Sequence, residues 1–131
     1  MVLKLTLKPG ERVAINGAVI VNGDRRASLM VENHARVLRE SDIMQPAEAT
    51  SPARLIYLAI MMMYLEPDSQ NEKHSEYETR LREFLAAISD ADALQVCATL
   101  AAHIANKDYY KGLIQCRQLI EFEEQRLSHV A

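Results

Sequence analysis

Basic side chains gather at the start of the sequence. Residues 1–44 carry seven Lys and Arg against five Asp and Glu, a balance of +2, whereas residues 45–131 carry eight basic and thirteen acidic side chains, a balance of −5. A cationic segment attracts phosphate groups and an anionic one repels them. We therefore expect any polyanion site to use the basic residues of the first segment: Lys4, Lys8, Arg12, Arg25, Arg26, Arg36 and Arg39.

Two interpretations of these cations stay open from the residues alone. Lys and Arg on the solvent face of a small sheet can reach phosphates and base edges together. Charged residues on the outer face of an amphipathic sheet are also ordinary, and residues 1–44 contain no aromatic ring on which a base could stack. The pair Arg25-Arg26, which follows a predicted turn, is the part of the set best presented to solvent.

Catalytic and metal-binding patterns are missing from the sequence. It contains no HExxH, P-loop, GxGxxG or GxSxG motif. Cys97 and Cys116 lie far apart without CxxC spacing, which is typical of core thiols in a reduced cytosolic protein. No signal-peptide pattern opens the chain, and the apolar run at 55–65 is too short to span a bilayer. We predict a cytoplasmic protein with no membrane contact, enzyme activity, metal or cofactor. The histidines, scattered over different elements, are His34, His74, His103 and His129.

Short alternating segments predict that residues 1–44 form a β module. Apolar and polar residues alternate with the period of two that is typical of a half-buried strand. Asn16-Gly17 is a strong hairpin signal, and Asn22-Gly23 is expected to repeat it. A five-stranded meander of this size buries too little apolar surface to stand alone, so its Leu3, Leu5 and Leu7 face needs a partner, either the helices or a second copy. The predicted strands are 2–8, 11–15, 18–21, 26–31 and 35–38.

The rest of the chain predicts helices, which gives an α+β fold with a small antiparallel β module (1–44), a linker (45–51) and a domain resembling a four-helix bundle (52–131). Ser51-Pro52 predicts a helix start, with serine as N-cap and proline at the first position. The helix at 52–65 is apolar nearly all round and is expected to be central. Further helices are predicted at about 71–88, 89–105 and 108–127.

The run of three methionines at 61–63 leaves two interpretations open. Unbranched thioethers can repack around different ligands, so Tyr57, Met61 and Tyr64 could form a partner-binding surface. The alternative is that these side chains fill the core of a buried helix.

Three stretches resemble the FlbT family of flagellar-biosynthesis repressors: LKLTLKPGERVAINGAVIVNGDRR, LRESDIMQ and TSPARLIYLAIMMMYLEPD. The resemblance covers nearly the whole chain. It implies a cytoplasmic post-transcriptional regulator that represses flagellin synthesis by acting at the 5′ untranslated region of flagellin mRNA and promoting its decay. It also implies a second small flagellar regulator, of the FlaF type, as a partner.

A more distant resemblance covers residues 1–44 only. LKLTLKPGE and VLRESDI are similar to the first and last strands of the carbon storage regulator family, although Leu7 stands where that family has a basic residue. The resemblance implies an interlocked homodimer in which the first strand of one subunit and the last strand of the other form each RNA site, here with Leu5, Thr6, Lys8 and Arg39. The full set of expected RNA-binding residues is Lys4, Leu5, Thr6, Lys8, Arg25, Arg26, Arg36 and Arg39. In the alternative function, the β module is only a dimerisation scaffold and the helices bind FlaF, a flagellin or another regulator without direct RNA contact.

Overall fold

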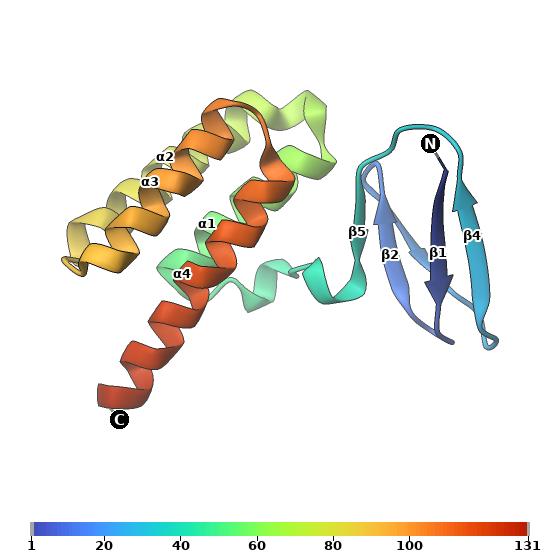
Figure 1. Cartoon of the computed structure of the whole chain (residues 1–131), viewed down its shortest axis with the longest axis horizontal. Helices are drawn as coiled ribbons and strands as arrows, with labels where there is room; N and C mark the ends of the chain where they lie inside the picture. Colours follow the sequence, from blue (N-terminus) through green and yellow to red (C-terminus); the bar gives the residue numbers. More distant parts are fainter. Residues whose placement is uncertain (1, 131) are drawn as a thin grey trace. The chain divides into compact units, whose positions relative to one another are not determined.

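The chain folds into two compact units, Met1–Ile43 and Met44–Ala131 (Figure 1). The computed structural model describes the backbone of residues 2–130 and the side chains of residues 2–126. Five antiparallel strands in two small sheets precede four α-helices, which confirms the predicted α+β class.

The strands lie where the alternation predicted them, but their pairing differs. They are β1 (Leu3–Leu7), β2 (Arg12–Ile15), β3 (Ala18–Val21), β4 (Ala27–Val31) and β5 (Val37–Arg39). One sheet pairs β1 with β4, and the other has the order β3-β2-β5, so the predicted meander is wrong. The reason lies in the turn after β1. Glu11 N donates to Lys8 O at 3.0 Å, and Gly10 has φ +71° after Pro9, which is the geometry of a type II turn. Such a turn splays its flanking strands, so β2 leaves β1 and joins the second sheet.

Only one of the two Asn-Gly pairs forms a hairpin turn. Asn16 and Gly17 have φ of 52° and 89°, and Ile15 pairs with Ala18, as predicted for a two-residue turn. Neither Asn22 nor Gly23 adopts positive φ, so the second predicted hairpin is wrong. β3 and β4 belong to different sheets, and the Asn22 side chain bonds to other parts of the module instead.

The β module has a small core of its own. Leu5, Leu7 and Val13 are buried, and four half-buried residues pack against them: Ile15, Leu29, Val31 and Val37. Leu5 and Leu7 are buried inside the β module itself, so the expectation that their face needs the helices or a second copy to cover it is wrong for these two residues. Leu3 remains 48% exposed.

The helical unit contains α1 (Pro52–Leu65), α2 (Gln70–Ala87), α3 (Ala91–Ala105) and α4 (Tyr109–Val130). Single 3-10 turns lie at Glu40–Asp42, Pro46–Glu48 and Pro67–Ser69. α1 begins as predicted, because the Ser51 side chain accepts a hydrogen bond from Arg54 N. It packs against both α2 and α4, while α3 packs against α4. Within the described residues, no helix is both long and apolar enough to cross a membrane.

Candidate nucleic-acid interface

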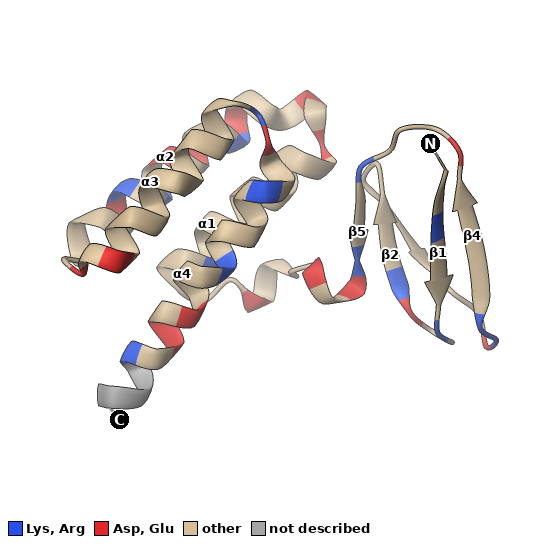
Figure 2. Cartoon of the chain, viewed as in Figure 1, with Lys and Arg blue, Asp and Glu red and all other residues tan. Residues whose placement is uncertain are grey.

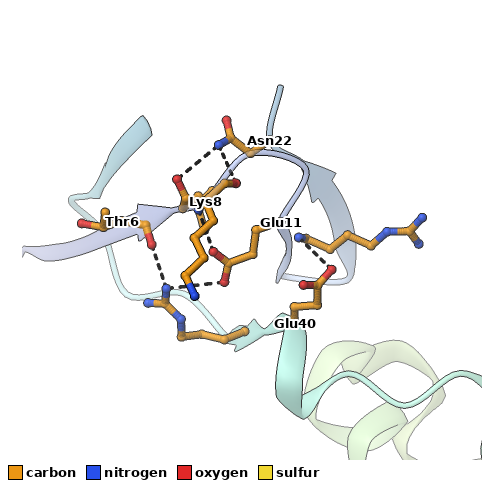
Figure 3. A network of polar contacts seen from close by, with 8 residues as sticks. Thr6, Lys8, Glu11, Asn22 and Glu40 are labelled. Atoms are coloured by element: carbon orange, nitrogen blue, oxygen red, sulfur yellow. Dashed lines mark hydrogen bonds and ion pairs between the residues drawn. The ribbon is translucent and has the colours of Figure 1, made fainter. Parts of the chain in front are cut away.

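Asn22 fixes the end of the β module at which β1 terminates (Figure 3). Its carboxamide nitrogen donates to Lys8 O at 2.9 Å, to Arg25 O at 2.8 Å and, more weakly, to Leu7 O at 3.3 Å. Its oxygen accepts from Gly23 N at 2.9 Å. One side chain thus ties the end of β1 to the segment that leads into β4.

The residues tied by Asn22 bring three cations to the same end of the module. We call Lys8, Arg25 and Arg26 the basic end. In Figure 2, blue segments lie where β1 ends and where β4 begins. All three side chains are exposed, and none forms an ion pair with another described residue. Asn22 fixes the backbone of Lys8 and Arg25, and Arg26 follows directly in the chain. The exposed Asp24 beside Arg25 adds one negative charge, so this end keeps an excess of positive charge, which favours phosphate binding.

β1 presents a second, weaker set of candidates. Lys4 and Thr6 lie on its exposed face, where β4 places Met30 and Ser28 opposite them. The side chain of Leu5 points the other way and is only 3% exposed. The Leu5 side chain is turned into the module, because a strand turns alternate side chains to opposite faces, and the expected contribution of Leu5 to an RNA site stays a prediction.

Arg39 lies close to the basic end but already has partners. Its guanidinium donates to Thr6 O at 2.8 Å and lies 3.6 Å from a Glu11 carboxylate oxygen. The other Glu11 oxygen accepts from Lys8 N at 2.8 Å. Arg39 thus joins β5 to β1 across the two sheets, and its charge is compensated.

These residues border a hollow of about 280 Å³ between the turn after β1 and the end of β5. Its lining contains as many carboxylates as cations, since Glu11 and Glu40 face Lys8 and Arg39. Glu40 also accepts a hydrogen bond from Arg12 N at 3.3 Å. The hollow itself is therefore a poor anion site, and the exposed basic end is the better one.

Arg36 is not brought together with the basic end. Its backbone N–H donates to Asn16 Oδ1 at 2.9 Å, and its carbonyl accepts from Asn16 N at 2.9 Å. Asn16 lies at one end of β2, whereas Glu11 and Asn22 lie at the other. The Arg36 Nε is buried without a hydrogen-bond partner among the described residues.

Sequence reasoning missed Asn22 and Glu11, the residues that hold the basic end in place. Asn22 was predicted to form a turn, and Glu11 was one more charge on a strand. Both residues contact partners that are distant in sequence: Glu11 and Arg39 are 28 positions apart, and Asn22 and Lys8 are 14 positions apart. No local pattern signals such contacts.

The residues expected to bind a protein partner lie mostly in the helical core. Tyr57 and Met61 are 2% and 5% exposed, so they cannot form a partner-binding surface, and the core interpretation holds for them. Tyr64 is half-buried, with its ring centroid 5.9 Å from that of Tyr110. α1 is central, so most of its side chains serve packing.

A different surface of the helical unit is open. A groove of about 640 Å³ runs between α2 and α3. Its lining combines apolar side chains, among them Leu81 and Leu85, with the charged Glu78, Arg82 and Lys107. Leu85 is 39% exposed. Tyr77 lies at its base, where burial raises the tyrosine pKa to about 12.

The thiols and histidines form no reactive group in the described part of the chain. Cys97 and Cys116 are free and buried, and burial raises the pKa of both thiols. Cys116 Sγ donates to Ala53 O at 3.4 Å. No group of three His, Cys, Asp or Glu among the described residues could hold a metal ion. The side chain of His129 lies outside the described residues.

The fold and this surface define a two-unit α+β protein with a small β module that presents fixed cations and an acidic four-helix unit. The chain belongs to the FlbT family, because the family model described as "Flagellar protein FlbT" matches residues 3–127. This confirms the first resemblance. The comparison with solved structures gives no significant match, so the likeness to carbon storage regulators stays a prediction.

Curated relatives match along the whole chain. A "Probable flagellum biosynthesis repressor protein FlbT" of Caulobacter sp. (strain K31) is 50% identical over 131 residues, covering 100% of both chains. The "Flagellum biosynthesis repressor protein FlbT" of Caulobacter vibrioides (strain ATCC 19089 / CIP 103742 / CB 15) is 49% identical, covering 100% of this chain and 93% of the relative. A Bradyrhizobium diazoefficiens relative, "Probable flagellum biosynthesis repressor protein FlbT 1", is 38% identical over 125 residues, 95% of this chain and 84% of its own.

Proposed function

We propose that the chain is a post-transcriptional repressor of flagellum biosynthesis that binds the 5′ untranslated region of flagellin mRNA and promotes its decay. Membership of a family whose curated relatives are named flagellum biosynthesis repressors supports the repressor role. The observation that carries RNA binding is the basic end. Asn22 gathers three exposed, unpaired cations on the unit with positive net charge.

The proposal assigns different roles to the residues around Asn22. Lys8, Arg25 and Arg26 contact phosphates, with Lys4 extending the surface along β1. Arg39, already bonded to Thr6 O and Glu11, acts mainly by positioning. Phosphate contacts supply affinity and salt dependence but no sequence information, so the bases are read elsewhere on the module.

Titration of flagellin leader RNA at several salt concentrations tests the proposal. Each phosphate neutralised on a single strand contributes about −0.7 to the slope of log K against log salt. The double variant Arg25→Gln/Arg26→Gln should therefore flatten the slope by about 1.4. Binding that is absent, or a slope that the variant leaves unchanged, would refute direct RNA contact.

A charge-matched control is available in the helical unit. Lys73→Gln/Lys111→Gln removes the same two charges from α2 and α4, outside the lining of the groove between α2 and α3. We expect its slope to stay within about 0.3 of that of the unmodified chain, because long-range charge effects are screened at these ionic strengths. In cells, flagellin mRNA should live longer with the β-module variant than with the control.

The open groove between α2 and α3 favours a second candidate function. The helical unit would be an adaptor that binds a FlaF-type regulator or a flagellin, since the apolar and charged residues of the groove suit the two faces of an amphipathic helix. Leu85→Glu should then abolish recovery of the partner in the absence of RNA, because it places a charge in the groove. Ala86→Glu adds the same charge to exposed α2 surface outside the groove lining and should leave recovery intact. Equal recovery with both variants would argue against the adaptor.

A further inference from the structure

β3 is an unprotected edge of the β module. It pairs only with β2, and all four of its residues are exposed. Val19, Ile20 and Val21 are 54%, 39% and 57% exposed. Natural edge strands usually carry a charge, a proline or a bulge that prevents further pairing. β3 has no charge and no proline.

The hydrogen-bond phase of the β2–β3 hairpin shows which backbone groups of β3 are free of β2. Ile15 and Ala18 close the two-residue turn, so this pair exchanges both of its hydrogen bonds. Bonded pairs recur at every second residue of an antiparallel ladder. Asn22 N donates to Glu11 O at 2.8 Å, which confirms the phase. The N–H and C=O groups of Val19 and Val21 therefore point away from β2.

The other edges of the two sheets suit self-pairing less well. In an antiparallel pair about a twofold axis, a strand meets its own copy, so like charges approach each other. β1 carries Lys4, and β5 ends at Arg39. β4 begins directly after the Arg25-Arg26 pair. Charge thus argues against β1 and β5. β4 is uncharged as well, but its Ala27, Leu29 and Val31 are half-buried, whereas all four residues of β3 are exposed.

We propose that two copies of the chain pair through β3, antiparallel, about a twofold axis at Ile20. The sequence Val19-Ile20-Val21 reads the same in both directions. The outward-pointing N–H and C=O groups are also symmetric about Ile20, because they belong to Val19 and Val21. Val19 exchanges two hydrogen bonds with Val21 of the second copy, and symmetry supplies two more. The two Ile20 side chains face each other at the axis as a non-hydrogen-bonded pair. The result is one continuous sheet in which β2 and β5 of each copy flank the joined β3 strands.

The interface is small, which sets its strength. A four-residue strand pair buries well under the roughly 1,200 Å² of a stable protein–protein interface. The dimer is therefore weak and dependent on concentration. It needs no RNA and no residue of the basic end, so it stands or falls separately from the proposed function.

Disulfide trapping of the full chain without RNA tests the register. Cβ atoms of a non-hydrogen-bonded pair lie about 4.5–5.5 Å apart, close enough for a disulfide after a small adjustment. Ile20→Cys should therefore form a cross-linked dimer under mild oxidation at least ten times faster than Val19→Cys. Each Val19 lies one residue from the axis, so the two Val19 residues are two positions apart along the ladder, beyond the roughly 7 Å Cα separation that a disulfide tolerates. The native thiols are buried and do not compete. Equal rates for the two variants would overturn the proposal, and would be the result if copies interlocked through β1 and β5 instead.

Sedimentation equilibrium of Val21→Pro is the second test. Its N–H points outward, so proline removes a donor of the dimer without touching a bond to β2. Dimerisation should weaken at least tenfold, while amide exchange of β2 stays slow. An unmodified chain that remains monomeric up to millimolar concentration would overturn the proposal, as would a Val21→Pro chain that dimerises normally.

Discussion

Replacing Asn22 by aspartate should loosen the whole basic end. The new side chain has the same shape, but it places a carboxylate oxygen where the carboxamide nitrogen donated to Lys8 O, Arg25 O and Leu7 O. Each hydrogen bond contributes about 1 kcal/mol net, and the third is long. We therefore expect Asn22→Asp to destabilise the β module by about 2–3 kcal/mol.

The assay has to report the β module specifically. All Tyr and Phe residues lie in 57–122 and the chain has no Trp, so optical signals from aromatic residues follow the helical unit. Amide hydrogen exchange resolves the two units. A loss of 2–3 kcal/mol should accelerate exchange of protected β1 and β2 amides by roughly 30- to 150-fold. The tyrosine signal serves as an internal control and should not change.

Asn33→Asp is the matched control, because Asn33 is exposed in the connection before β5. Surface substitutions of this kind usually change stability by less than about 0.5 kcal/mol, which corresponds to a change in exchange of less than about threefold. Similar exchange in the two variants would show that Asn22 is not the tie we describe. It would also remove the main structural reason for treating Lys8, Arg25 and Arg26 as one site.

Three further predictions concern the helical unit. Glu123 accepts two hydrogen bonds at the α1 N-terminus, one from the Ser51 hydroxyl and one from Ala53 N at 2.8 Å. In thermal unfolding, Glu123→Ala should therefore lower the stability of the helical unit by about 2 kcal/mol. The control Glu121→Ala, at an exposed position of the same helix, should be nearly neutral. Burial raises the pKa of Tyr77 from 10.0 to about 12, so the folded state binds the phenolic proton more tightly than the unfolded state does. The stability that this difference contributes is complete below pH 10 and is lost as the pH rises from 10 to about 12. Denaturant unfolding of Tyr77→Phe should therefore depend less on pH between 10 and 12 than that of the unmodified chain, and identical pH profiles would refute the burial argument. Cys116 is buried with a raised pKa, so iodoacetamide should label it at least about 100 times more slowly in the native state than in denaturant, and fast native labelling would contradict its position.

Local features of the fold were predictable because they depend on neighbouring residues. The alternation of apolar and polar residues predicted all five strands. Asn16-Gly17 predicted the hairpin turn, and Ser51-Pro52 predicted the start of α1. Pairing between strands was not predictable in the same way. β1 joins β4 through residues that lie 20 to 28 positions apart in the sequence, and only the type of turn at Pro9-Gly10 argues against its pairing with β2.

The candidate site was predictable in composition but not in arrangement. Counting charges placed the cations in the β module, and the predicted turn favoured Arg25-Arg26, but neither observation separated Arg36 from Arg39. The structure separates them by their contacts. Arg36 lies at the far end of β2, Arg39 is bonded to β1, and Arg25 remains exposed. Each distinction rests on a partner that is distant in sequence.

The two proposed surfaces of the β module support each other physically. The β3 edge is apolar and the basic end is cationic, so RNA binding need not compete with pairing of two copies. A pair joined at β3 would carry two basic ends on one continuous sheet. Once one end holds a leader RNA, the second meets the same strand at a high effective concentration, which raises affinity without any new contact. Three cations per chain would bind RNA only weakly at physiological salt, and a weak, concentration-dependent dimer would therefore make repression respond steeply to the amount of the protein.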